Sequence, residues 1–211
     1  MISWTEYIKI FTALLAIVNP VGIIPIFVSL TGKVTKHESA RIARTASMTV
    51  AIVLILSTLF GRLVLNFFGI SIGSFKVSGG ILLMLIAVAM MQARRNQSRQ
   101  TSEEAQEAED KESIAVVPIA TPLLAGPGAI STVIIFAHES FHPLHITLII
   151  ISSLVVALLS WIALSIANPI SKFLSKTTIN IITRLMGLLL AAIAVEFIVG
   201  GLSQLLPALA K

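Results

Sequence analysis

The sequence predicts an all-α membrane protein with six transmembrane helices, arranged as two inverted repeats of three helices. Three observations lead to this fold class. Of the 211 residues, 56% are hydrophobic and only 12% are charged, which is too little charge for the surface of a soluble domain. Six apolar stretches are long enough to cross a bilayer. An internal repeat with a constant offset relates the two halves of the chain.

The six predicted spans follow from the apolar stretches, since a spanning helix needs about 20 mainly apolar residues. They cover residues 7–30, 43–67, 75–91, 113–137, 144–167 and 179–206. Between the third and fourth spans lies a polar segment with a basic beginning and an acidic end, which we expect to be a solvated connector. The chain therefore divides into a first repeat at residues 1–91, a connector at 92–112 and a second repeat at 113–211, all within one transmembrane domain.

Lys and Arg are distributed unequally between the two predicted sides of the membrane. Ten lie on the side of the connector and at most four on the other side. The positive-inside bias then makes the connector cytoplasmic and places both termini outside, in a multi-pass protein of the cytoplasmic (inner) membrane. Nucleic acid is not expected as a partner, because the basic residues flank apolar runs and form no polar face. The expected partners are the bilayer and a small solute, and the sequence leaves a homo-oligomer open.

The internal repeat has an offset of 107 residues without gaps. It aligns Pro20 with Pro127, and it aligns residues 80–88 with residues 187–195, where six of nine positions are identical. Three spans in each half is an odd number, so the second half enters the membrane from the opposite side. Inverted repeats of this kind are typical of secondary transporters, with the site between the halves. The alternative is a gene duplication in a membrane protein that transports nothing.

Helix-breaking residues interrupt the first and fourth predicted spans at corresponding positions. Each proline removes a backbone donor and disturbs a preceding carbonyl, and unpaired backbone at membrane depth is tolerated only where protein or water covers it. We therefore predict that helices 1 and 4 are broken and that their ends face one central substrate site, where N–H groups bind a carboxylate and C=O groups an ammonium. Simple kinks are the alternative. The predicted substrate-binding residues are Asn19, Pro20, Gly22, Pro25, Thr121, Gly126, Pro127, Gly128, Ser131 and Thr132.

Glu196 is a carboxylate within the sixth predicted span, where a charge is costly unless it is paired, protonated or hydrated. It is either a proton- or cation-coupling residue or a partner in a structural hydrogen bond. A zinc-site pattern, H-E-x-x-H, begins at His138, but Pro143 follows it directly and it lies between two spans, so we expect no metal there. The chain has no cysteine, no nucleophile elbow and no P-loop. We expect neither a cofactor nor an enzymatic activity.

Three segments carry a resemblance to a known family. They are NPVGIIPIF in the first span, PLLAGPGAIST in the fourth and TRLMGLLLAAIAVEFIVGG in the sixth. Together they resemble the MarC family of six-span integral membrane proteins. The resemblance implies a relation to the LysE exporters and, from SnatA-type members, transport of small neutral amino acids such as glycine and alanine. It also implies that the first and fourth spans meet around a central site.

Three functions compete on this basis. The first is a secondary transporter of small neutral amino acids that works by alternating access. The second is an exporter of other small polar metabolites or toxic compounds, with the same fold and a wider or more apolar cavity. The third is a membrane interaction protein that transports nothing and whose broken helices only pack.

Overall fold

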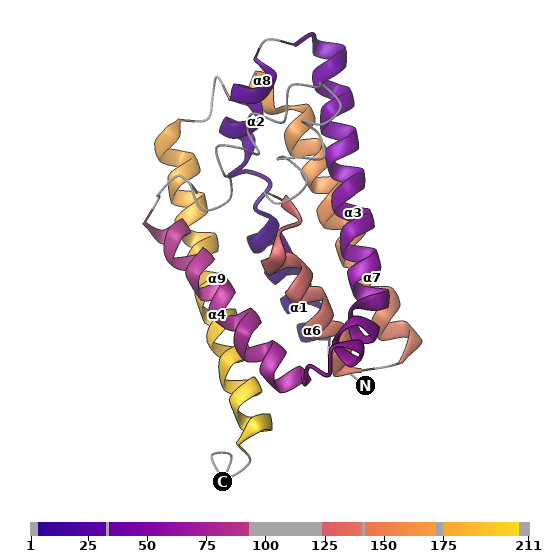
Figure 1. Ribbon diagram of the computed structural model, residues 1–211. Coiled ribbons are helices and arrows are strands. Elements are labelled where there is room, and N and C mark those ends of the chain that lie inside the picture. The colour runs from indigo at the N-terminus through magenta and orange to yellow at the C-terminus, as the bar shows by residue number, and fades with distance from the viewer. Residues whose placement is uncertain (1–3, 33, 93–123, 141, 172–174, 207–211) are drawn as a thin grey trace.

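The computed structural model describes residues 4–32, 34–92, 124–140, 142–171 and 175–206, and every regular element within these ranges is a helix. Figure 1 shows the arrangement. In chain order the helices are α1 (Trp4–Val18), α2 (Ile24–Thr31), α3 (Lys36–Phe67), α4 (Ile72–Met91), α6 (Pro127–Glu139), α7 (Pro143–Ser165), α8 (Ala167–Ile170) and α9 (Lys176–Leu205).

Four of these helices are long and apolar enough to cross a membrane. They are α3, α4, α7 and the segment Thr177–Leu205 of α9, and they correspond to the second, third, fifth and sixth predicted spans. The first predicted span is present as α1 and α2, separated by residues 19–23. Of the fourth, the structure describes α6 and the residues from 124 onward. The chain is thus a helical membrane protein with several apolar spans.

The long helices begin at side-chain caps that satisfy their first N–H groups. Thr35 and Glu38 form a capping box at the start of α3, which explains why this helix begins before the apolar run. Ser71 caps α4 and Ser175 caps α9. Between α3 and α4 the chain reverses at Gly69, whose φ of 65° lies in the left-handed region, where glycine has no steric penalty.

Helices α1 and α6, of 15 and 13 residues, lie at the centre of the bundle (Figure 1). Both pack against α7 on one side and against the α4–α9 pair on the other, and they also contact each other. Their inward side chains are fully buried, for example Leu14 of α1 and Ile135 of α6. Helices α1 and α6, each of which has a predicted break at one end, are therefore surrounded by the other helices of the bundle.

Helices α4 and α9 run antiparallel (Figure 1). They pack closely because glycines remove the side chains that would separate them. A Cβ added to Gly80 would lie 2.8 Å from the Ala194 carbonyl oxygen, and one added to Gly187 would lie 3.0 Å from the Ala87 carbonyl oxygen. Gly187 is the repeat partner of Gly80, and Ala194 is that of Ala87. The two contacts are therefore reciprocal.

The outer surface of the bundle is strongly apolar. Leu56 of α3, Leu85 of α4, Leu158 of α7 and Leu188 of α9 are each about half exposed or more. A soluble protein rarely exposes large contiguous apolar patches, whereas a membrane protein presents them to lipid. This surface agrees with an integral membrane location.

Candidate substrate site at the two helix breaks

The first break is a tight turn around Asn19. Helix α1 ends at Val18, and Asn19 has a φ of 45°, a left-handed conformation that asparagine tolerates better than most residues. The Asn19 carbonyl oxygen accepts from the Gly22 N–H at 3.1 Å, and the Asn19 Oδ1 accepts from the same N–H at 3.2 Å. A Cβ on Gly22 would lie 2.8 Å from the Asn19 Cγ. Asn19 and Gly22 therefore fix the turn together.

The two prolines of this break differ in their effect on the backbone. Pro20 cannot donate to the Ala16 carbonyl, and within the described residues no other donor reaches that oxygen. The Val21 carbonyl, which Pro25 leaves free in the same way, accepts from the Ile24 N–H at 3.2 Å. The carboxyl end of α1 consequently presents a free carbonyl, with the partial negative charge of a helix C-terminus.

The second break lies at the start of α6. Gly126 is its N-cap residue in an extended conformation, without a side-chain cap, and Pro127 is the first helical residue. The Gly126 carbonyl oxygen accepts from the N–H groups of Ala129 and Ile130 at 3.0 and 3.1 Å. The amino end of α6 carries the partial positive charge of a helix N-terminus. Thr121, the remaining predicted residue on this side, lies outside the described residues.

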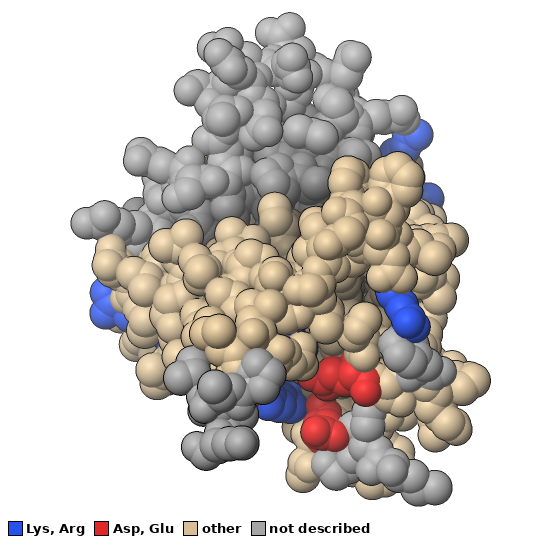
Figure 2. All heavy atoms as spheres, turned by 60° about the horizontal axis from the view of Figure 1, so that its bottom comes forward, with Lys and Arg blue, Asp and Glu red and all other residues tan. Residues whose placement is uncertain are grey.

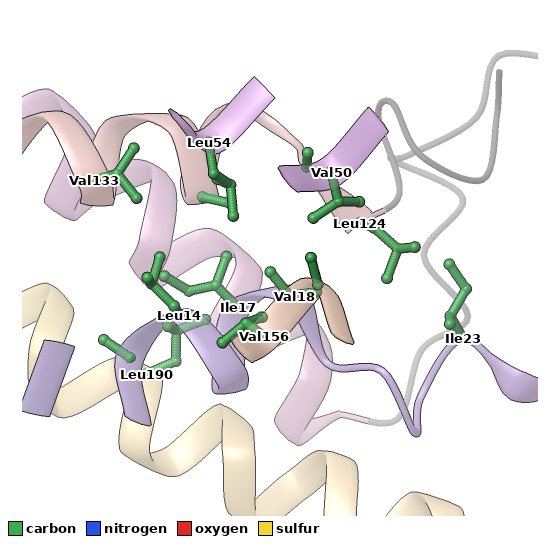
Figure 3. Close-up of a cluster of buried hydrophobic side chains, with 14 of the residues drawn as sticks. Leu14, Ile17, Val18, Ile23, Val50, Leu54, Leu124, Val133, Val156 and Leu190 are labelled. Atoms are coloured by element: carbon green, nitrogen blue, oxygen red, sulfur yellow. The ribbon is translucent and has the colours of Figure 1, made fainter. Parts of the chain in front are cut away.

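Gly128 is where the two breaks come together. A Cβ added to Gly128 would lie 2.8 Å from Cδ1 of Ile86, 3.2 Å from Cδ2 of Leu83 and 3.6 Å from Cγ2 of Ile17. The start of α6 therefore contacts α4 and the last turn of α1. Figure 3 shows Val18, Ile23 and Leu124, which flank the two breaks, in the same buried cluster as Val50 and Leu14.

Ser131 and Thr132 are buried, and both hydroxyl groups donate to the Gly128 carbonyl oxygen, at 3.1 and 2.8 Å. Ser131 also lies against Gly79 of α4. Both hydroxyl protons are thus used in hydrogen bonds within α6. Each hydroxyl oxygen can still accept a hydrogen bond from a ligand. Of the predicted prolines, Pro20 is buried, while Pro25 and Pro127 are exposed.

Glu196 of α9 forms an ion pair with Lys9 of α1. The sequence did not identify Lys9 as the partner of Glu196 in advance. A carboxylate at membrane depth favours a cationic partner, and Lys9 lies within the first predicted span. These two facts could have suggested the pair. The pair connects the central helix α1 to α9.

The H-E-x-x-H pattern is divided between two elements. Helix α6 ends at Glu139, and Ser140 after it is extended. His142 is the N-cap of α7, where its Nδ1 accepts from the Leu144 N–H at 3.3 Å. A zinc site of this pattern needs both imidazoles one turn apart on a single helix, and the chain folds differently here.

Comparison with known proteins relates the whole chain to one family of membrane proteins. The family model described as "MarC family integral membrane protein" matches residues 4–206. A relative from Escherichia coli K12, the UPF0056 membrane protein YhcE, is 41% identical over 96% of this chain and 94% of its own. The membrane protein MJ0972 of Methanocaldococcus jannaschii is 39% identical over 93% of this chain and 86% of its own.

A third relative, the UPF0056 membrane protein YvbG of Bacillus subtilis, is 35% identical over 96% of both chains. These names describe membrane proteins and state no substrate. No solved structure matches the chain.

Proposed function

The chain belongs to the MarC family of integral membrane proteins, and from this premise we propose that it is a secondary transporter of small neutral amino acids, of the glycine and alanine class, that works by alternating access. The observation that carries the proposal is the contact between the two broken helices at Gly128. Corresponding breaks in two halves of a membrane protein are the best sequence pointer to a transport site.

The repeat supports alternating access. Helices α3 and α7 begin at residues 36 and 143, which are 107 residues apart, and they pack against each other. The reciprocal contacts of Gly80 and Gly187 add a second pair of repeat-related helices, this one antiparallel. We propose that the halves form an inverted repeat of three spans each, so that two nearly equivalent packings open the site to opposite sides.

The substrate class follows from the groups at the breaks. The amino end of α6 favours a carboxylate, and the free carbonyl at the end of α1 favours an ammonium group. The side chains there, Asn19, Ser131 and Thr132, carry no charge. A zwitterion satisfies both helix ends. At Gly22 and Gly128 even an added Cβ would meet neighbouring atoms, so the close packing there favours a small substrate over a large one.

The orientation that we propose places both termini outside and residues 92–112 in the cytoplasm. Lys36, Arg41 and Arg44 lie in the first turns of α3, and Arg62 lies near its other end. The richer basic end belongs on the cytoplasmic side of the inner membrane. Because the chain has no cysteine, a single cysteine placed in residues 92–112 should react with an impermeant maleimide from the cytoplasmic side. Reaction from the outer side alone would show that the orientation is the opposite one.

The test of function is counterflow of labelled glycine, alanine, serine and threonine into proteoliposomes. Gly128→Leu should abolish uptake, because its side chain would enter the space between Ile86, Leu83 and Ile17. Gly200→Leu is the matched control, since no atom lies within 4 Å of a Cβ there. The proposal is supported if wild type and Gly200→Leu take up label only when unlabelled solute is present inside, and Gly128→Leu takes up none. Monodisperse wild-type protein that exchanges none of the four amino acids would refute it.

We also propose that Glu196 couples transport to protons. A proton on its carboxylate would remove the charge that holds Lys9, so protonation and helix contacts would be linked. Glu196→Gln should then abolish uptake driven by a pH gradient while exchange continues. Gradient-driven uptake at the wild-type rate in this variant would remove the coupling role.

A further inference from the structure

One end of the bundle has polar contacts that join the two halves of the chain. It is the end where α1 and α4 begin and where α6 and α9 finish, at the bottom of Figure 1. Figure 2, turned so that this end comes forward, shows acidic side chains gathered there with basic ones beside them. Three contacts there each include a pair between a residue of the first repeat and one of the second.

The first contact is the ion pair between Lys9 and Glu196. Glu196 lies nine residues before the end of α9, about 13 Å along a helix that rises 1.5 Å per residue. Its neighbours Val195 and Val199 are half exposed on the apolar outer surface. Water therefore screens this pair less than it would at a soluble surface, and separating the charges costs more than it would there.

The second contact is centred on His145, which is only 1% exposed. Its Nε2 lies 2.8 Å from the Phe136 carbonyl oxygen and its Nδ1 lies 3.3 Å from the Tyr7 hydroxyl. A carbonyl only accepts, so Nε2 carries the proton, and in the neutral ring Nδ1 accepts from Tyr7. His145 thereby connects α1, α6 and α7.

The third contact is the ion pair between Lys76 of α4 and Glu139 at the end of α6, with 3.7 Å between Nζ and Oε1. The three contacts together involve α1, α4, α6, α7 and α9. We call the six side chains the latch: Lys9, Glu196, Tyr7, His145, Lys76 and Glu139.

We propose that the latch closes this end of the bundle, and that its contacts must break before the site at the two helix breaks can open toward this side. The inference rests on the proposed transport function. Alternating access moves one half against the other, and every contact of the latch connects the two halves. The latch residues act on access to the site and need not touch the substrate.

The test measures access without any substrate. Ala13 is fully buried and lies one turn along α1 from Lys9, so Ala13→Cys reports opening in a chain that otherwise has no cysteine. The reaction of this Ala13→Cys parent with an impermeant maleimide, applied from the latch side of proteoliposomes, should become about fivefold faster when Lys9→Gln or Glu196→Gln is added. That factor corresponds to about 1 kcal/mol, the upper value for ion pairs at a soluble surface, and it is therefore the minimum expected for a pair that water screens less.

Two further variants of the same parent distinguish a specific effect on the latch from misfolding of the protein. Arg184→Gln removes an exposed charge from the same helix as Glu196 and should leave the maleimide labelling rate unchanged. The exchange Lys9→Glu with Glu196→Lys restores an ion pair and should return the rate toward that of the parent, which a misfolded protein would not do. Equal rates in Glu196→Gln and the parent, or no recovery in the double variant, would overturn the latch.

Two measurements on the same proteoliposomes test the transport function and the latch separately. Counterflow in the parent reports the transport function, whereas maleimide labelling at position 13 reports the latch. Faster labelling without counterflow of any amino acid would reject the proposed function while still assigning these contacts to closure. Counterflow with labelling that no latch variant changes would reject the latch and leave the transporter in place.

Discussion

Replacing Gly80 by alanine should destabilise the protein, although alanine is the better helix former. The added Cβ would lie 2.7 Å from Cγ1 of Ile198, 2.8 Å from the Ala194 carbonyl oxygen and 3.0 Å from the Ile198 nitrogen. Two of these atoms belong to the backbone of α9, so no side-chain rotation can relieve the contact. The helices α4 and α9 must separate along an interface that otherwise holds them in close contact.

The expected magnitude combines two opposing terms. Overpacking against a rigid neighbour costs about 3 kcal/mol, the upper part of the usual range. The change from glycine to alanine in a helix interior returns about 1 kcal/mol. Gly80→Ala should therefore lower the free energy of unfolding by about 2 kcal/mol. Gly200→Ala, in open space on α9, should raise it by about 1 kcal/mol.

The assay is reversible unfolding in mixed micelles at increasing SDS, followed by the fluorescence of Trp4 and Trp161. Gly187→Ala is included because its Cβ would lie 2.9 Å from Cβ of Met90 and 3.0 Å from the Ala87 carbonyl oxygen, so its cost should match that of Gly80→Ala. A difference of less than about 1 kcal/mol between Gly80→Ala and Gly200→Ala would show that the interface yields easily, and would refute the reasoning.

Two further predictions concern Asn19 at the first break and His138 near the end of α6. Asn19→Ala should lower the free energy of unfolding by about 2 kcal/mol, because alanine is strained in the left-handed conformation and cannot accept the hydrogen bond from the Gly22 N–H. Asn19→Gly loses only the hydrogen bond and should lower it by about 1 kcal/mol. Equal losses for the two variants in SDS unfolding would show that the backbone is not strained. Burial, and then the charges of Arg62 and Lys76, lower the pKa of His138 from its ordinary value of 6.5, so its contribution to stability is present above pH 6.5 and is lost as the pH falls below it. The melting temperature of His138→Gln relative to the wild-type protein should therefore rise as the pH is lowered from 7.5 to 5.5. A difference in melting temperature that does not depend on pH would contradict this cause.

The positions of the breaks could be predicted because proline acts locally. Helix α1 ends at Val18, two residues before Pro20, and α6 begins at Pro127, as expected where a proline removes a backbone donor. Helix α3 begins at residue 36, seven residues before the predicted apolar span at 43–67, because its first two turns are polar. The capping box of Thr35 and Glu38 was visible in the sequence and marks the true start.

Other features of the site depend on tertiary packing that one sequence does not display. Lys9 and Glu196 are far apart in the chain, and only the packing of α1 beside α9 makes them partners. The hydroxyls of Ser131 and Thr132 donate to Gly128, and this choice of rotamer does not follow from residue type. The sequence could place these residues near the breaks without telling which of their atoms are free.

The reciprocal contacts between α4 and α9 have the form of an isologous dimer interface within a single chain. In such an interface residue i of one copy meets residue j of the other, and j meets i. Gly80 meets Ala194 and Gly187 meets Ala87, which is the pattern that two antiparallel copies of residues 1–91 would make with Gly80 and Ala87 alone. In the inverted repeat that we propose, covalent fusion of two such copies would free the two sides to diverge, so that each half could acquire residues, such as Glu196, that its counterpart does not need.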